Sequence, residues 1–222
     1  MAVTMDSTGI TYSDGTVQTT RYGTDLDTGS LMSVKEYRVS GSWTWYKPSN
    51  CTSVLVRVVG GGGGAAGYCE SGGAGGYAEK LIDVTGISSA TVTVGGGGGN
   101  TGYYAAAGDG GTSSFGSYVS ATGGYGANRN YGHTGGTGGY GSGGDINLTG
   151  GAGTGHSNSL GSGSTSRGGD NYFGGAPGCN RNNGGGELGP SAPGTGGSGA
   201  RTDGNWAGST GRAGAVFIWE YR

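Results

Sequence analysis

The chain is poor in the residues that build an ordinary hydrophobic core. Of its 222 residues, 32% are hydrophobic and 12% are charged, and both values lie below the averages of globular proteins. Its 60 glycines bring no side chain to bury, so a core can form only from the segments that flank the glycine-rich tract. We therefore expect a monomer that is weakly stabilised for its length, for which oligomerisation is a usual remedy.

Clustered positive charge is also missing. The net charge is −2 and the pI is near 5.6. A protein that binds the phosphate backbone of nucleic acid needs a basic stripe, whereas the arginines are dispersed here. We expect no nucleic-acid partner.

No stretch approaches the roughly 18 consecutive apolar residues of a transmembrane helix. Residues 1–20 have neither the basic nor the apolar region of a signal peptide. We expect no membrane insertion and no cleaved leader.

Cysteine is scarce, with 3 residues at positions 51, 69 and 179. Their count is odd and no CxxC spacing occurs. Free thiols in a protein made in a reducing cytosol are the favoured interpretation, and a pairing of Cys51 with Cys69 is the alternative.

Proline is scarce as well, and this scarcity limits which structures the glycine-rich tract from Gly95 to Gly214 can form. With 4 prolines and no sustained Gly-X-Y period, the tract is not collagen. Thr134–Gly144 nonetheless runs close to a three-residue period, which suits a threefold polyproline-II helix whose backbone bonds laterally. The alternative is disorder, because glycine loses the most entropy on folding. Order is favoured because aromatic residues punctuate the tract, namely Tyr103, Tyr104, Phe115, Tyr118, Tyr125, Tyr131, Tyr140, Tyr172, Phe173 and Trp206.

Strand-like patterns stand on both sides of this tract. Tyr37 to Trp45 places apolar residues at period two, residues 54–59 alternate in the same way, and residues 75–84 and 90–94 follow as two further strands. One more strand, 216–221, ends the chain. The predicted fold is all-β: a β-sandwich-like module over residues 35–222, with strands at about 35–94 and 216–221. The insert, 95–214, forms loops or polyproline-II-like strands at its far end.

Residues 1–34 form a separate N-terminal segment. Ile10–Tyr12 and Thr16–Thr19 are predicted to pair as short strands around Ser13-Asp14-Gly15, a tight-turn signal. Asp25, Asp27 and Thr28 are predicted to cap a brief helix through Leu31 and Met32.

Two stretches resemble a known family. Gly9–Thr19 has the form GI-x-(F/Y)-SDGT-x-QT, which is similar to a segment that recurs in tail-fibre proteins of tailed bacteriophages and cyanophages. From about Lys35 to Arg222, a WTWxKP segment, a valine strand ending in glycines, GGYAE, TVTVGGGGG, TSSFGSYVSATGG and a terminal GAVFIWEY resemble the glycine-rich distal domain of phage tail fibres. This resemblance implies a homotrimeric fibre-tip module that recognises the host surface.

The same resemblance gives the partners and the location. The N-terminal segment, 1–34, would attach or trimerise the fibre and meet a baseplate or proximal fibre protein. The tip would meet a host surface polysaccharide or an outer-membrane protein. The protein would be made in the host cytoplasm and would reside in the virion.

Motifs for cofactors and catalysis are absent. No Gly-Lys-Ser/Thr follows a glycine loop, so there is no P-loop. Gly143-Gly144-Asp145 lacks the repeats of calcium-binding nonapeptides, and His133, His156 and Cys179 lack the short spacing of zinc sites. The acidic residues Asp109, Asp145, Asp170, Glu187 and Asp203 show no paired carboxylates for glycan cleavage. We expect no enzyme, cofactor or resident metal; a tailspike-like depolymerase and a purely structural glycine-rich protein are the alternative functions.

The candidate receptor-binding residues are the aromatic, basic and histidine side chains of the tract. Tyrosine offers a large rigid contact area, and recognition surfaces combine it with Gly, Ser and Asn. The competing interpretation is that the rings are spacers between glycine strands, which is favoured for Phe115 and Tyr118. Low-complexity sequence offers no periodicity that would orient the others. The candidates are Tyr103, Tyr104, Tyr125, Arg129, Tyr131, His133, Tyr140, His156, Tyr172, Phe173 and Trp206.

Overall fold

The computed structural model describes residues 29–67, 70–102, 105–128, 134–155, 166–176, 178, 192–200 and 207–222, together with the backbone of three short strands near the N-terminus. Throughout these ranges the chain is all-β, as predicted. No helix that could cross a bilayer occurs in them.

The N-terminal strands form a small antiparallel sheet. β2 (Gly9–Thr11) pairs with β1 (Thr4–Asp6) on one side and with β3 (Val17–Gln18) on the other. The predicted hairpin pairing is confirmed at the backbone level. The predicted helix through Leu31 and Met32 is wrong, because both residues begin strand β4 (Leu31–Tyr37). Leu31 pairs with Tyr221 of the C-terminal strand, and Met32 lies at a shift in the register.

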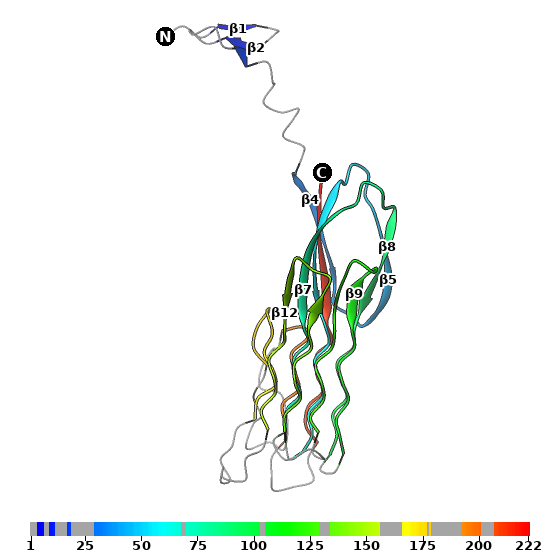
Figure 1. Ribbon diagram of the computed structural model, residues 1–222, viewed down its shortest axis with the longest axis vertical. Coiled ribbons are helices and arrows are strands. Elements are labelled where there is room, and N and C mark those ends of the chain that lie inside the picture. Colours follow the sequence, from blue (N-terminus) through cyan, green and yellow to red (C-terminus); the bar gives the residue numbers. More distant parts are fainter. Residues whose placement is uncertain are drawn as a thin grey trace.

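Two antiparallel five-stranded sheets face each other in a sandwich (Figure 1). The first has the order β12-β7-β6-β13-β4 and the second has the order β11-β10-β9-β8-β5. The C-terminal strand, β13, thus lies at the interior of the first sheet, between β6 and β4. The strands are β4 (Leu31–Tyr37), β5 (Gly41–Tyr46), β6 (Ser53–Val59), β7 (Tyr77–Asp83), β8 (Ser89–Val94), β9 (Ser113–Phe115), β10 (Val119–Ala121), β11 (Gly141–Ser142), β12 (Ile146–Leu148) and β13 (Ala215–Tyr221).

The core between the sheets comes from period-two alternation along each strand. Val54, Val56 and Val58 of β6 are fully buried, and so is Ile218 of β13. Phe115 of β9 is also fully buried, and its ring packs edge-on against Trp45 at 5.5 Å between centroids. Burial of each such side chain contributes about 1.5–3 kcal/mol. Phe115 is therefore a core residue of the sandwich rather than a spacer between glycine strands.

A carboxylate is buried within this apolar core. Glu220 of β13 is 1% exposed. The indole Nε1–H of Trp45 donates to its Oε1 at 2.7 Å, and the Ser33 hydroxyl donates to its Oε2. These two hydrogen bonds allow the Glu220 carboxylate to be buried, since buried polar groups are tolerated when they are hydrogen-bonded. Trp45 of the second sheet thus contacts the first sheet through a polar group as well as through apolar packing.

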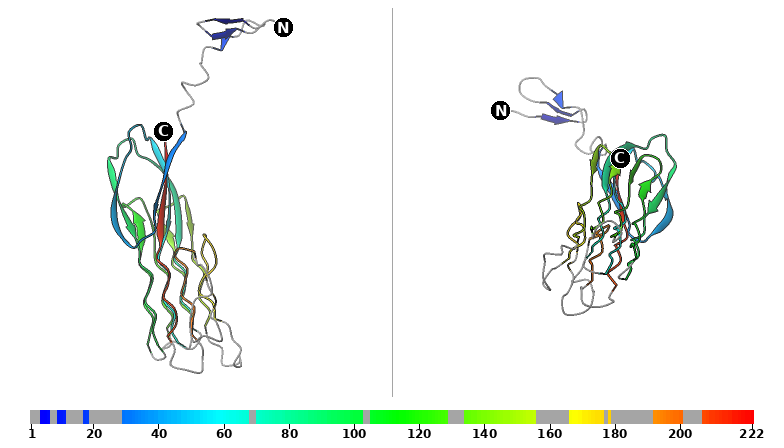
Figure 2. Two further views of the ribbon diagram at one scale, coloured as in Figure 1. Left: turned by 180° about the vertical axis from the view of Figure 1, so that it is seen from behind. Right: turned by 60° about the horizontal axis from the view of Figure 1, so that its bottom comes forward.

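Below the sandwich, the strands continue as extended glycine-rich segments that run side by side in all views (Figures 1 and 2). Some segments leave a strand and others lead back into one. Outgoing segments are 60–66 after β6, 95–101 after β8, 122–128 after β10 and 149–155 after β12. Returning segments are 70–76 before β7, 105–112 before β9, 134–140 before β11 and 207–214 before β13; segments 166–170 and 194–200 lie among them. We call these segments the glycine bundle.

Segment 60–66 shows how the bundle is held together. Its successive N–H groups donate in rotation to three antiparallel neighbours, 70–76, 105–111 and 207–214. A rotation with period three is what a threefold polyproline-II helix produces when it bonds laterally. The donor–acceptor pairs, 2.8–3.0 Å apart, are Gly60–Gly76, Gly61–Gly111, Gly62–Arg212, Gly63–Gly73, Gly64–Gly108 and Ala65–Ser209.

The carbonyls of segment 60–66 repeat this rotation toward three other neighbours. They accept from segments 95–101, 122–128 and 194–200, which run parallel to it. The segment is thus enclosed by six others. Segment 70–76 is bonded in the same way, its donors going to 151–154, 194–197 and 122–125 in turn.

Such close packing leaves no room for side chains. A Cβ added at Gly61, Gly62 or Gly64 would overlap the carbonyl oxygen of Gly96, Thr195 or Gly99. The Cα–H groups therefore point at neighbouring carbonyl oxygens, an arrangement that itself gives weak hydrogen bonds. Glycine is required here for close backbone approach.

The structure differs from the sequence-based boundaries in two respects. The 95–214 tract supplies strands β9, β10, β11 and β12 to the two sheets, in addition to bundle segments. The glycine run at 60–76, which the sequence analysis placed within the β module, forms the two enclosed segments of the bundle.

The enclosed segment gives a direct test of this packing. Gly62→Ala should lower the Tm by about 3–10 °C, because overpacking costs about 1–3 kcal/mol and each kcal/mol shifts a chain of this size by a few degrees. Gly99→Ala is the matched control, since an added Cβ there meets nothing within 4 Å. Calorimetry that showed equal Tm values for the two variants would contradict the enclosed packing.

The buried carboxylate gives a second test. Trp45→Phe removes the donor to Glu220 and some core volume, so the free energy of unfolding should fall by about 2–4 kcal/mol. Trp43→Phe on the same strand, where the ring is partly buried, should cost less. Urea unfolding measures both; an equal loss would mean that the contact with Glu220 adds nothing.

Candidate functional site

The threefold period fixes which side chains of the outer bundle segments face away from the bundle. In segment 122–128 the exposed Tyr125 lies between Gly124 and Gly126, both buried. In segment 134–140 the exposed positions are Thr134, Thr137 and Tyr140. Every third residue thus faces outward, at about 9 Å intervals along a polyproline-II helix.

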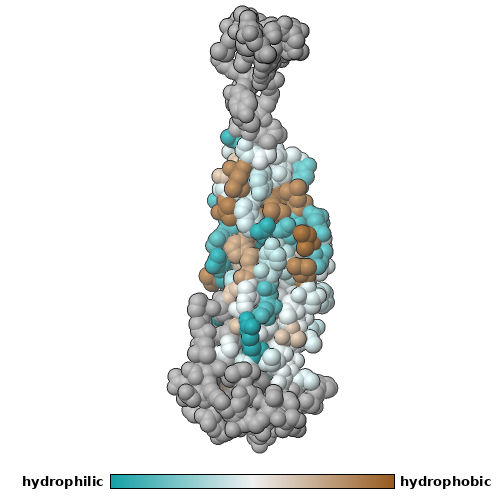
Figure 3. Space-filling model, turned by 90° about the vertical axis from the view of Figure 1, so that its left-hand side faces the viewer, coloured by the Kyte–Doolittle hydropathy of each residue, from teal (hydrophilic) through white to brown (hydrophobic). Residues whose placement is uncertain are grey.

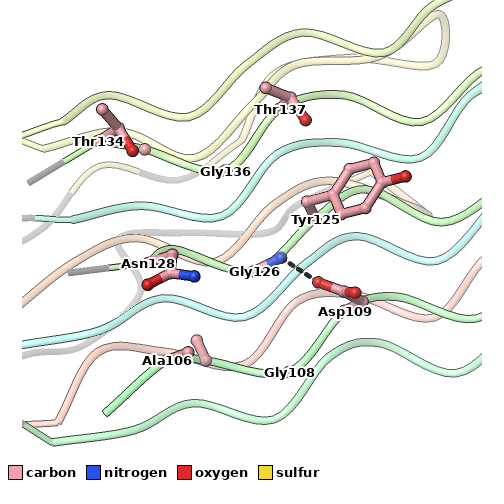
Figure 4. A pocket seen from close by; sticks show the side chains of 11 residues that line it. Ala106, Gly108, Asp109, Tyr125, Gly126, Asn128, Thr134, Gly136 and Thr137 are labelled. Carbon is pink, nitrogen blue, oxygen red and sulfur yellow. Dashed lines mark hydrogen bonds between the residues drawn. The ribbon is translucent and has the colours of Figure 1, made fainter. Parts of the chain in front are cut away.

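Three adjacent segments bring their outward residues together around a groove (Figure 4). The groove has a volume of about 630 Å³. Its middle strip is segment 125–128, and segments 106–109 and 134–137 flank it. The side chains at its surface are those of Ala106, Asp109, Tyr125, Asn128, Thr134 and Thr137.

Backbone hydrogen bonds hold these side chains in register. The Tyr125 N–H donates to the Thr137 carbonyl at 2.9 Å, and the Gly126 N–H donates to Oδ1 of Asp109 at 2.8 Å. Asn128 and Thr134 form a β-bridge at one end. The Tyr125 ring is 50% exposed, so it presents a face to solvent from a fixed backbone.

A second group of side chains lies on the outer face of the first sheet, next to the bundle. The ring of Tyr172 stacks on that of Tyr77 with centroids 4.1 Å apart and planes 18° from parallel. Phe173 packs against Phe217 at 5.1 Å and edge-on against Tyr77 at 5.8 Å. Tyr172 is 55% exposed. The segment that contains Tyr172 and Phe173 is thereby docked onto the sheet.

Charged groups continue this cluster. The Arg57 guanidinium lies 4.6 Å from the centre of the Trp219 ring and forms an ion pair with Glu79. The Tyr77 hydroxyl donates to the same carboxylate at 2.9 Å. Burial, and then the hydrogen bond and charge of Glu79, raise the pKa of Tyr77 far above its ordinary value.

The structure describes four of the eleven candidate residues. Tyr125, Tyr140 and Tyr172 are about half exposed and face solvent, whereas Phe173 packs in the aromatic cluster. Tyr125 lines the groove, and Tyr172 and Phe173 meet each other on the sheet instead. The remaining candidates lie outside the described residues, namely Tyr103, Tyr104, Arg129, Tyr131, His133, His156 and Trp206.

Most of the residues that line the groove were not among the candidates predicted from sequence. Asp109, Asn128, Thr134 and Thr137 line it with Tyr125, but only Tyr125 was a candidate. The expectation that the tract offers no orienting periodicity is wrong for these segments, because the three-residue spacing noted at Thr134–Gly144 also sets the outward positions. The same three-residue spacing, applied to segments 106–109 and 125–128, would have indicated that Asp109 and Asn128 face outward.

No group of three or more metal-ligating side chains occurs in the described ranges. The carboxylate in the calcium-like segment has a structural partner: Oδ2 of Asp145 accepts the Leu81 N–H at 2.9 Å. The Cys51 thiol is buried and free, and burial raises its pKa. Cys69 and Cys179 lie outside the described residues.

Comparison with protein families agrees with this architecture. The family described as glycine-rich domain matches residues 38–221, a range that contains the glycine bundle and every strand of the two sheets except β4. The chain belongs to the glycine-rich domain family. A search of curated proteins gave no match.

The Tyr77 environment predicts a pH dependence. Because the pKa of Tyr77 is raised in the folded state, its contribution to stability is fully present below about pH 10 and is lost as the pH rises above that value. Tyr77→Phe should therefore show a shallower fall of Tm between about pH 9 and pH 11 than the wild type. Tyr46→Phe, whose ring is 74% exposed, should keep the wild-type profile. Identical profiles for all three proteins would contradict the prediction.

Proposed function

We propose that the chain is the receptor-binding tip of a bacteriophage tail fibre and acts as a homotrimer. The observation that carries the proposal is that the first and last strands of the module, β4 and β13, meet at one end of the sandwich, whereas the glycine bundle lies at the other end. The chain enters the sandwich at β4 and leaves it at β13 at the same end, where the Arg222 N–H donates to the Ser30 carbonyl at 3.2 Å. The glycine bundle extends from the opposite end (Figure 1).

The placement of β4 and β13 at one end and of the bundle at the other suits a protein that is attached at one end and presents a binding surface at the other. The bundle is stiffened by lateral hydrogen bonds, and its aromatic side chains Tyr125 and Tyr140 are half exposed at outward positions. Recognition residues are commonly placed on such rigid scaffolds.

The resemblance of Gly9–Thr19 and of residues 35–222 to tail-fibre sequences supports the viral context. On this proposal residues 1–34 join a baseplate or proximal fibre protein, and the protein acts in the virion after synthesis in the host cytoplasm. The partner at the tip is a polysaccharide or an outer-membrane protein of the host.

An apolar row on the first sheet supports association of copies. Val34, Trp219, Leu55 and Leu81 stand in register across β4, β13, β6 and β7 on the outer face. Val34 is 43% exposed and Leu81 is 58% exposed. On the side drawn in Figure 3 the strongly apolar patches lie on the sandwich, and the coloured part of the bundle is pale with a hydrophilic patch. Monomeric proteins rarely expose large contiguous apolar patches, so contacts between copies are assigned to the sandwich.

Cell binding tests the function. Fluorescently labelled protein should bind saturably to cells of at least one strain in a bacterial panel, and unlabelled protein should block adsorption of a phage to that strain. Absence of binding across the panel, with folded protein, would contradict the receptor role. Release of reducing sugars from the bound cells would favour the depolymerase instead.

Light scattering joined to size-exclusion chromatography tests the trimer. The wild type should elute with three times the chain mass of 21.6 kDa. Leu81→Lys places a charge in the apolar row and should shift the mass toward one chain, because burying an unpaired charge is costly. Val39→Lys is the control: Val39 is 71% exposed and lies between β4 and β5. A trimer that survives Leu81→Lys would contradict the assigned contact face.

A further inference from the structure

The groove on the flank of the bundle combines an aromatic face with polar groups. The Tyr125 ring is half exposed, at one end of the groove (Figure 4). An aromatic face is negative and attracts the weakly positive C–H groups of a ligand that lies flat on it. A sugar ring offers such C–H groups on one face and hydroxyls around its edge.

The polar side chains around Tyr125 match hydroxyl groups. Asp109 is exposed, and a carboxylate accepts several hydrogen bonds, so the bond from Gly126 to its Oδ1 leaves capacity for a ligand. Thr134 and Thr137 bring hydroxyls that both donate and accept. The lining therefore offers donors and acceptors in the mixture that a polyol requires.

The charge of the residues that line the groove indicates whether its ligand is neutral or anionic. Asp109 is the single charged residue among the described residues that line the groove. A phosphate, sulfate or carboxylate ligand calls for Arg, Lys or a helix N-terminus, and a negative Asp109 repels such groups. The site suits a neutral ligand.

The backbone around the groove is fixed before a ligand arrives. The Ala107 N–H donates to Ala127 and the Tyr125 N–H donates to Thr137, at 3.0 and 2.9 Å. Preorganised groups lose less entropy on binding. The volume of about 630 Å³ falls within the range of small-ligand sites, roughly 300–1,000 Å³, and accommodates a short oligosaccharide.

We propose that this groove is a subsite for neutral saccharides, in which Tyr125 stacks on a pyranose ring and the Asp109 carboxylate accepts hydrogen bonds from the hydroxyl groups of that ring. The inference rests on the proposed receptor role and gives it a ligand class and a place on the flank of the bundle.

Saturation-transfer NMR and titration calorimetry on the full chain test the subsite. The probes are neutral oligosaccharides of glucose, galactose and mannose at millimolar concentration, with glucose 6-phosphate as the anionic counterpart. At least one neutral probe should bind, and glucose 6-phosphate should not. Tyr125→Ala should weaken that binding about tenfold or more, as expected for an aromatic anchor. Asp109→Asn, which keeps an acceptor for the Gly126 N–H, should weaken it less.

Tyr46→Ala removes an exposed ring from the sandwich and is the matched control, with unchanged affinity expected. Equal Tm values for wild type and Tyr125→Ala exclude loss of fold. Binding that survives Tyr125→Ala, binding of none of the neutral probes, or a preference for glucose 6-phosphate would overturn the subsite.

Cell binding by the same variants separates the two proposals. If Tyr125→Ala binds cells as well as the wild type does, the groove is not the receptor subsite and the fibre-tip role stands. If the wild type binds a neutral probe through Tyr125 but binds no cells, the subsite stands and the receptor role fails.

Discussion

Lateral hydrogen bonding between backbones that have no side chains between them is the constraint on which this structure depends. Each residue from Gly61 to Ala66 turns its N–H and its carbonyl toward different neighbours, so six segments must approach to backbone contact. Buried backbone groups need partners, and in this bundle the partners come from other segments rather than from a β-ladder. The requirement explains both the 60 glycines and the small share of hydrophobic residues. Hydrophobic burial is concentrated in the sandwich, where it aligns the strands from which the segments start.

The same constraint determines which positions of the bundle can carry side chains that contact a ligand. Inward positions are mostly glycine, with alanine, serine and the buried Thr195 and Glu70 among them, and the aromatic side chains of Tyr125 and Tyr140 lie at outward positions. Tyr125 and Thr137 face solvent for this reason, and hydrogen bonds between their segments set their spacing. The bundle thus resembles a rigid display surface whose positions can vary without disturbing the interior. The single end at which the chain enters and leaves gives that surface a direction.

Much of the sandwich could be predicted from sequence, because alternation in residues 54–59 and 216–221 is a local signal. The short strands β9–β12 could not, because two or three residues flanked by glycine and serine give no readable period. Phe115 is an example: its burial depends on Trp45, from a distant strand. The groove was predictable in part. Tyr125 stands out by residue type, whereas Asp109 and Thr137 acquire their role only when three segments distant in sequence are aligned. The rotation of hydrogen bonds that aligns them is a property of the packed bundle and not of any one segment.

Hydrogen–deuterium exchange of the backbone amides tests the central claim most directly, because exchange reports whether each N–H is bonded. The account predicts that the amides of Gly60–Ala66 and Ser71–Gly76 are as strongly protected as those of β6 and β13, and that protection is continuous from strand into segment. Exchange of Gly60–Ala66 at the rate of an unstructured peptide, beside a protected β6, would contradict it and would leave a β-sandwich with flexible glycine loops.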